Sequence, residues 1–172
     1  MFQKHKPLEV LATTIAISFL TSSGAVASMG GVGNPPVLEF NGAIVAQQQD
    51  AVEYLQQGIN LYQQGKVEAA EAAFRQAIEM DPELAQAHAN LGTVLANQNK
   101  LAEAIPEFKE AVRLRPDMAI LHYQLGVALY MENRSAEAID SLKAARDLLN
   151  EEGKTKEAEQ VEEAIAKIES ES

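Results

Sequence analysis

The stretch His-Ala-Asn-Leu-Gly-Thr-Val-Leu at residues 88–95 decides the fold, because it recurs at a fixed interval. Its counterparts are Tyr-Leu-Gln-Gln-Gly-Ile-Asn-Leu at 54–61 and His-Tyr-Gln-Leu-Gly-Val-Ala-Leu at 122–129, each 34 residues away. A period of this length indicates a stacked-repeat protein rather than an enzyme with a single core. After each stretch come an alanine and, four residues later, a large apolar residue: Ala70 and Phe74, Ala104 and Phe108, Ala138 and Leu142.

The composition fits a helical repeat protein and excludes several kinds of site. Of the 172 residues, 47% are hydrophobic and only 5% are aromatic, which suits thin packing between helices better than a sheet core. The net charge is -11, and an acidic surface repels phosphate backbones, so we expect no nucleic-acid partner. The absence of cysteine excludes disulfides and thiolate metal sites.

Residues 1–27 have the order of a secretory signal peptide: a basic start, an apolar run over residues 10–20, and Ala25-Val26-Ala27 as the cleavage site. We therefore expect an exported protein, in the periplasm or an equivalent lumenal space. Two alternatives remain open. A retained segment would anchor the chain and provide its only membrane contact, whereas translation from Met29 would leave the protein in the cytoplasm. The next segment, residues 28–49, contains several glycines and two prolines and is predicted to be a flexible linker.

From Asp50 onward the apolar residues follow a helical period, and each repeat is predicted to be a helix, a short turn and a second helix. Gly65, Asn99 and Asn133 occupy equivalent turn positions, and both residue types tolerate the left-handed conformation that ends a helix. A seventh helix has one apolar stripe and is predicted to cap the stack. The expected helices span residues 50–64, 67–80, 84–97, 101–114, 118–131, 135–151 and 155–169.

The glycine of each repeat is predicted to let two helices approach closely. A glycine inside a helix costs about 1 kcal/mol relative to alanine, so its presence at three equivalent positions has a packing reason. We expect the alanine of each repeat to face this glycine, and the large apolar residue that follows to fill the space between repeats. Pro106 lies inside a predicted helix, and the spacing places it on the solvent side, where a bend is tolerated.

These features resemble tetratricopeptide repeats, in the period and in the Gly, Ala, Phe/Leu and Pro positions. The resemblance covers Asp50 to about Glu152. Gln57 departs from it, since leucine is usual there, as do Tyr54 and two histidines where tryptophan is common, and Asn150 where proline is usual. The resemblance implies an all-α fold, a right-handed superhelical array of three helix-turn-helix repeats with a C-terminal capping helix. The domain spans residues 50–170, with repeats at 51–84, 85–118 and 119–152 and the capping helix at 155–169.

The resemblance also implies that the first helices line a concave groove, and members of the family mostly bind peptides or protein segments. No charged residue stands at the groove positions of this chain. Members that grip the C-terminal carboxylate of chaperones use lysine, arginine and asparagine, and only Asn90 matches, so we do not expect that activity. Ile59, Tyr123 and Tyr130 are the candidate apolar anchors. The groove residues carried over are Leu55, Ile59, Tyr62, Asn90, Thr93, Asn97, Ile120, Tyr123, Gln124, Val127, Tyr130 and Met131.

No residue pattern indicates catalysis. His88 and His122 invite a metal or catalytic interpretation, but they stand where the family keeps a bulky packing residue, and neither has a carboxylate one turn away. Phosphate loops, nucleophile motifs and HExxH are missing. We therefore predict a non-catalytic adaptor or assembly factor with a protein or peptide partner and no cofactor. The alternatives are self-association into a homo-oligomer, and an undetected ligand-binding or enzymatic role.

The mature protein is expected to begin at Ser28, because the basic start, the apolar run and the cleavage site stand in the order that signal peptidase reads. The intact mass of the protein isolated from its native source measures this directly. A product that begins at Met1 would contradict export, and one that begins at Met29 would favour the cytoplasmic alternative.

Overall fold

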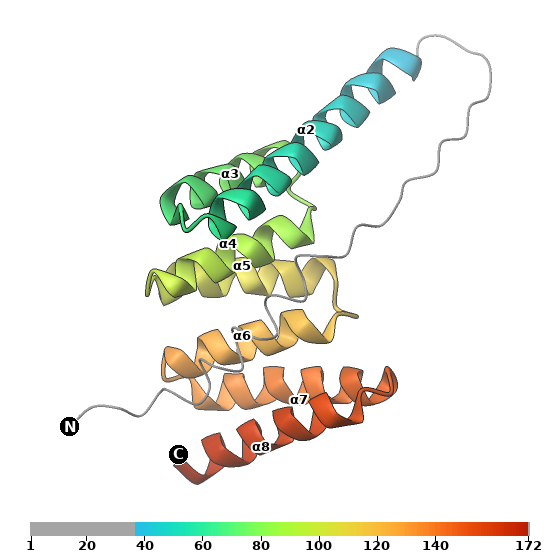
Figure 1. The fold of residues 1–172 in the computed structure, drawn as a ribbon. Coiled ribbons are helices and arrows are strands. Elements are labelled where there is room, and N and C mark those ends of the chain that lie inside the picture. The colour runs from blue at the N-terminus through green and yellow to red at the C-terminus, as the bar shows by residue number, and fades with distance from the viewer. Residues whose placement is uncertain (1–36, 172) are drawn as a thin grey trace.

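The computed structural model describes residues 37–171, and within them the chain forms helices and turns without any strand. The helices stack one after another into an elongated array, and each packs mainly on its neighbours in sequence (Figure 1). They are α2 (Val37–Gln63), α3 (Val67–Met80), α4 (Ala85–Asn97), α5 (Leu101–Leu114), α6 (Ala119–Met131), α7 (Ser135–Glu151) and α8 (Thr155–Glu171).

Four turns end their helices in the same way. Gly65 and Gly153 have φ of 74°, and Asn99 and Asn133 have φ of 61°, so all four adopt the left-handed conformation. In each case the N–H of the following residue reaches back to a carbonyl of the last helical turn, which satisfies a group that the helix end leaves free. The predicted turn positions are therefore confirmed. These bonds join Lys66 to Leu61, Lys100 to Leu95 and Arg134 to Leu129 at 2.9 Å each, and Lys154 to Leu149 at 2.8 Å.

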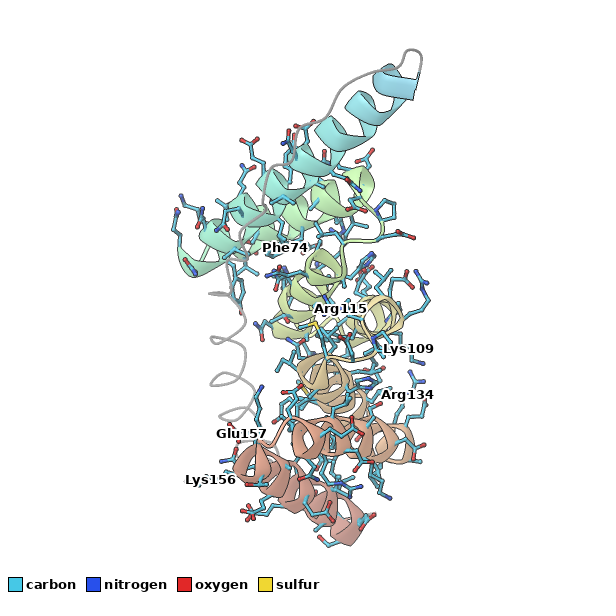
Figure 2. All side chains as sticks on the ribbon, turned by 90° about the vertical axis from the view of Figure 1, so that its right-hand side faces the viewer. Phe74, Lys109, Arg115, Arg134, Lys156 and Glu157 are labelled. Atoms are coloured by element: carbon cyan, nitrogen blue, oxygen red, sulfur yellow. The ribbon has the colours of Figure 1, made fainter. Side chains whose placement is uncertain are left out.

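The glycine of each repeat lies against the large apolar side chain of the same repeat. A Cβ atom on Gly58 would come within 2.5 Å of the Phe74 ring, which lies between α2 and α3 (Figure 2). On Gly92 it would come within 2.9 Å of the Phe108 ring. In the third repeat, Gly126 meets Leu142. The predicted close approach is confirmed. The prediction that an alanine faces the glycine holds only in the third repeat, where the Ala138 carbonyl oxygen lies 3.2 Å from a Cβ on Gly126; in the first two repeats the phenylalanine ring covers the glycine instead.

The C-terminal helix closes the array. Its buried residues, Ala158, Val161, Ala164, Ile165 and Ile168, form one apolar stripe, and the last two are only 2% and 1% exposed. Val161, Ile165 and Ile168 belong to a core cluster shared by α6, α7 and α8. The predicted capping helix is confirmed, and it runs two residues further than expected.

A buried carboxylate joins the first repeat to the second. Glu71 of α3 is 7% exposed, and its Oε2 accepts hydrogen bonds from Gln98 Nε2 at 2.7 Å and Lys100 Nζ at 3.2 Å. Burial alone would raise the pKa of Glu71, but the hydrogen bonds from Gln98, Lys100 and Arg75 outweigh it and lower the pKa. The equivalent residues of the second and third repeats are Ile105 and Ile139, so these hydrogen bonds between repeats have no counterpart further along the array.

The second helices α3, α5 and α7 have the bounds that the sequence predicts. Pro106 lies inside α5 and is exposed, so its predicted place on the solvent side is confirmed, and α5 continues through it.

The first helix is longer than predicted. The prediction that residues 37–49 belong to an irregular linker is wrong, because α2 begins at Val37. Only Gly42 in this stretch strongly disfavours a helix, and extending a helix that already exists avoids the cost of a new nucleus. The predicted signal peptide and residues 28–36 of the predicted linker lie outside the described residues. Over residues 37–171, no helix combines the length and hydropathy needed to cross a membrane.

Replacing Gly92 with alanine should lower the free energy of unfolding by about 1–3 kcal/mol, because the added methyl group overlaps the Phe108 ring. The Phe108→Ala variant should lose about 3–5 kcal/mol through the cavity it creates. The double variant should lose less than the sum, since the methyl group then enters the space left by the ring. Urea unfolding of the three variants measures this, and additive losses would show that the ring does not occupy this space.

Candidate peptide-binding face

The candidate site is the surface over α2, α4 and α6 that carries the predicted groove residues, and we call it the first-helix face. Three of its twelve predicted residues are buried: Leu55, Ile59 and Tyr123 are 6%, 4% and 5% exposed. Two candidate anchors, Ile59 and Tyr123, are therefore core residues and cannot be surface anchors. In each first helix, the side that faces the neighbouring first helix is buried against that helix. The predicted groove residues that remain partly or fully exposed are Tyr62, Asn90, Thr93, Asn97, Ile120, Gln124, Val127, Tyr130 and Met131.

Polar side chains on this face join each first helix to the next. An amide of α4 donates to a tyrosine hydroxyl of α2, and an amide of α6 donates to a threonine hydroxyl of α4 at 3.2 Å. A tyrosine hydroxyl of α6 donates to a carboxylate of α8 at 2.6 Å. The pairs are Asn97 with Tyr62, Gln124 with Thr93, and Tyr130 with Glu171. Sequence reasoning missed Glu171, because it stands beyond the predicted end of the last helix and at no repeat position.

The tyrosines keep this face neutral. Burial raises the pKa of Tyr62 despite the hydrogen bond from Asn97, and burial also raises the pKa of Tyr123. The bond to Glu171, and then burial, raises the pKa of Tyr130. All three hydroxyls therefore stay protonated near neutral pH, and they can form hydrogen bonds but cannot act as bases or anionic nucleophiles.

Two amides at equivalent positions carry unused hydrogen-bonding groups. Asn90 of α4 and Gln124 of α6 stand 34 residues apart, at the same position of neighbouring repeats. Asn90 Nδ2 and Gln124 Oε1 are buried and have no hydrogen-bond partner within the described protein, and the hydroxyl of Tyr123 is in the same state. A buried polar group without a partner costs about 1–3 kcal/mol, so a ligand that supplies partners would gain this energy. One donor and one acceptor match the C=O and N–H of a peptide group.

His88 is not part of the amide pair, and it joins α4 to α5 through Glu107. It is 7% exposed, its Nδ1 donates to Glu107 Oε2 at 2.7 Å, and its Nε2 donates to the Pro82 carbonyl at 3.0 Å. Both partners only accept, so the ring is bound as an imidazolium. Burial lowers the pKa of His88, but the bonds to Glu107 and Pro82 and the charges of Glu107 and Glu110 outweigh burial and raise the pKa.

The second histidine lacks such a partner. His122 Nε2 donates to the Pro116 carbonyl at 2.9 Å, but the position that corresponds to Glu107 is Ser141. Sequence reasoning searched for a carboxylate within one helical turn of each histidine and therefore missed Glu107, which comes from the facing helix. No group of three His, Cys, Asp or Glu residues able to hold a metal occurs in the part of the chain that the structure describes.

Charged residues gather on the second helices and their turns instead. Lys109 and Arg134 lie on the same side of the array (Figure 2), and both pair with Glu137, at 3.6 and 2.6 Å. The predicted positions of the first-helix face therefore carry no charge of their own, and the carboxylate that Tyr130 contacts comes from α8.

Comparison with known proteins identifies the fold. The family model described as tetratricopeptide repeat matches residues 55–119 and 91–153, and no curated protein matches the chain. The TPR2B domain of yeast Sti1, solved as a complex with pHsp70, is similar with a TM-score of 0.67 at 22% identity, over 72% of this chain and 99% of that one. The predicted all-α, right-handed superhelical array of tetratricopeptide repeats is confirmed.

Two bacterial structures are also similar. The Yersinia enterocolitica type III secretion chaperone SycD, in complex with a peptide of the translocator YopD, has a TM-score of 0.64 at 20% identity, over 69% of this chain and 92% of that one. A fragment of MamA from Desulfovibrio magneticus has a TM-score of 0.55 at 21% identity, over 71% of this chain and 77% of that one.

Replacing Glu107 with glutamine should destabilise the protein more at low pH than at high pH. Because the folded protein raises the pKa of His88, the ion pair stabilises it below the unfolded value of about 6.5, and this stabilisation is lost as the pH rises through the folded pKa. Urea unfolding at about pH 5.5 and about pH 9 gives the two differences. Glu103→Gln is the matched control, since it removes a carboxylate that pairs with an arginine, Arg75, at 3.6 Å and not with a histidine. Equal losses for Glu107→Gln at both pH values would contradict the imidazolium pair.

Proposed function

We propose that this chain, which belongs to the tetratricopeptide repeat family, is a non-catalytic adaptor or assembly factor that holds a segment of another protein on its first-helix face. The observation that carries the proposal is the pair of equivalent amides, Asn90 and Gln124, whose buried Nδ2 and Oε1 atoms have no partner among the described residues. Rotation of each amide would bring these atoms to a bound backbone. A segment that crosses two neighbouring first helices would meet one amide from each.

The chemistry of the face defines the kind of segment. Neighbouring packed helices lie about 10 Å apart, so a segment across α2, α4 and α6 covers about 20 Å, or about six extended residues. Val52, at the α2 end, is 56% exposed, and Ile120, at the equivalent position of α6, is partly exposed, so both can contact apolar side chains of the segment. We infer an uncharged, extended segment with apolar residues towards its ends.

The similar structures support a peptide ligand but not the same ligand. SycD was solved with a translocator peptide, and a domain of Spaghetti (RPAP3), at 22% identity, with the Hsp90 peptide SRMEEVD. That peptide carries acidic residues and a terminal carboxylate, whereas the first-helix face of this chain has no lysine or arginine at the predicted positions. A neutral internal segment fits this face better than an acidic C-terminus.

The proposal also includes export and the absence of catalysis. Export rests on the order of charge and hydropathy in residues 1–27. The absence of catalysis rests on the neutral tyrosines and on His88, whose two ring nitrogens are both engaged. No observation on the described residues favours an enzymatic role for either histidine.

The double variant Asn90→Ala/Gln124→Ala should bind its ligand about 5-fold to 150-fold more weakly, because each of the two lost hydrogen bonds is worth about 0.5–1.5 kcal/mol. Peptides of about ten residues, selected from a displayed random library against the purified chain, serve as the probe, and calorimetry gives each affinity. Moderate salt should change the affinity little, since the predicted positions carry no charge to screen.

The matched control replaces Gln76 and Gln160 with alanine. Both are exposed amides, on α3 and α8, outside the first-helix face, and their loss should leave the affinity unchanged. Selected peptides that bind both double variants as tightly as the wild type would place the site elsewhere. Steep weakening of binding by salt would point to the charged surface of the second helices.

A further inference from the structure

The N-terminal part of α2 extends beyond the repeat array. α2 has 27 residues and α3 has 14, which correspond to about 40 Å and about 21 Å of helix. The part of α2 that the other helices bury begins at Ala51, which is 0% exposed, whereas residues 48–50 are all exposed to solvent. We call residues 37–50 the overhang, and Figure 1 shows it projecting past the end of α3, with none of the described helices alongside.

The overhang has the composition of a packed helix. Its sequence is VLEFNGAIVAQQQD, and its only charges are Glu39 and Asp50. The apolar residues at positions 37, 40 and 44 continue the spacing of positions 51, 54 and 58, where α2 packs on the array: Ala51 is buried, Tyr54 packs against the core, and Gly58 lies against Phe74 of α3. The helix face that packs inside the first repeat therefore continues, in register, into a part of the helix that α3 does not reach.

Such a helix needs a partner. The overhang continues a packed helix and therefore needs no nucleus of its own, but an apolar stripe that stays exposed to water costs free energy. A membrane surface is a poor partner, because helices that lie on anionic bilayers carry lysine and arginine on their polar face and the overhang has neither. A surface that is apolar and nearly uncharged, and that repeats the same spacing, is required.

We propose that the overhang pairs with the overhang of a second copy of this chain, in antiparallel orientation. The second copy offers the same stripe at the same spacing, so the interface is self-complementary about a two-fold axis. With that axis level with position 42, position 40 of one copy lies level with position 44 of the other. The two halves of each stripe then cover one another.

The charge of the chain decides the orientation. The net charge is -11, and the described acidic residues other than Glu39 lie from Asp50 onward. A parallel pair would place two acidic arrays side by side, whereas an antiparallel pair holds the arrays at opposite ends. Two helices this short bury less than the roughly 1,200 Å² of a standard interface, so the dimer is weak, with a dissociation constant in the micromolar range.

Sedimentation equilibrium of the full chain tests the proposal. The wild type should change from monomer to dimer between about 1 and about 500 μM, and Phe40→Glu/Ile44→Glu should remain monomeric over that range. The control Ala46→Glu/Gln49→Glu adds the same charge on the opposite side of the helix and should dimerise within a few-fold of the wild type. Circular dichroism melting of all three proteins should agree, because the substitutions lie outside the packed array.

Cross-linking tests the orientation separately. The chain has no cysteine, so Phe40→Cys/Ile44→Cys provides the only thiols. Oxidation should give a covalent dimer if positions 40 and 44 of the two copies meet, and Ala46→Cys/Gln49→Cys should not. A covalent dimer from both pairs in equal yield would contradict the stated register.

Other occupants of the stripe would give different results, each of which overturns the proposal. A wild type that stays monomeric at 500 μM excludes the pair. Co-sedimentation of that monomer with vesicles of phosphatidylcholine and phosphatidylglycerol would assign the stripe to a membrane. Slow hydrogen exchange in the overhang that is lost when residues 1–36 are removed would assign it to the chain's own N-terminal segment. A dimer that survives Phe40→Glu/Ile44→Glu places self-association elsewhere on the array.

Discussion

The contact between a glycine of the first helix and a large side chain of the second determines the geometry of each repeat. Phe74, Phe108 and Leu142 are 2%, 3% and 0% exposed, and each occupies space that a Cβ on the facing glycine would enter. The helices therefore approach more closely than side chains on both would permit, and the buried apolar area offsets the cost of glycine in a helix. Because this contact is repeated, successive pairs stack in the same way and the first helices align on one face.

The fold was predictable from the sequence because its determinants are local and repeated. Gly65, Asn99 and Asn133 mark turns through a backbone conformation that few residues adopt, so the helix ends near them were predicted closely. The first helix was the exception. No repeat precedes the first helix, so no equivalent position marks where it begins. The glycines and prolines of residues 28–36 indicate a linker, but the helix already starts at Val37 and continues through residues 37–49.

The candidate site was less predictable, because its properties depend on contacts between repeats. A period of 34 residues identifies equivalent positions but does not show which of them the neighbouring first helix covers, and for this reason the sequence does not reveal that Ile59 and Tyr123 are buried. The partner of His88 lies on the facing helix, and Glu171 belongs to no repeat. The two central amides were identified as site residues, but their unused atoms become visible only once the neighbouring side chains are placed.

The carboxylate of Glu71 gives the array two unequal ends. In a linear stack each repeat is held only by its neighbours, so the weakest interface decides where the stack opens. Glu71 stabilises the first interface above its unfolded pKa, and this contribution disappears as the pH falls through its lowered folded value. The core of the last interface is formed by apolar residues, among them Val161, Ile165 and Ile168 of α8. Its carboxylates, such as Glu162 and Glu171, are exposed, and exposed ion pairs contribute little to stability. Acid therefore loosens the pair of helices that carries the overhang before it loosens the capped end, so the array has a polarity that its repeated sequence does not show.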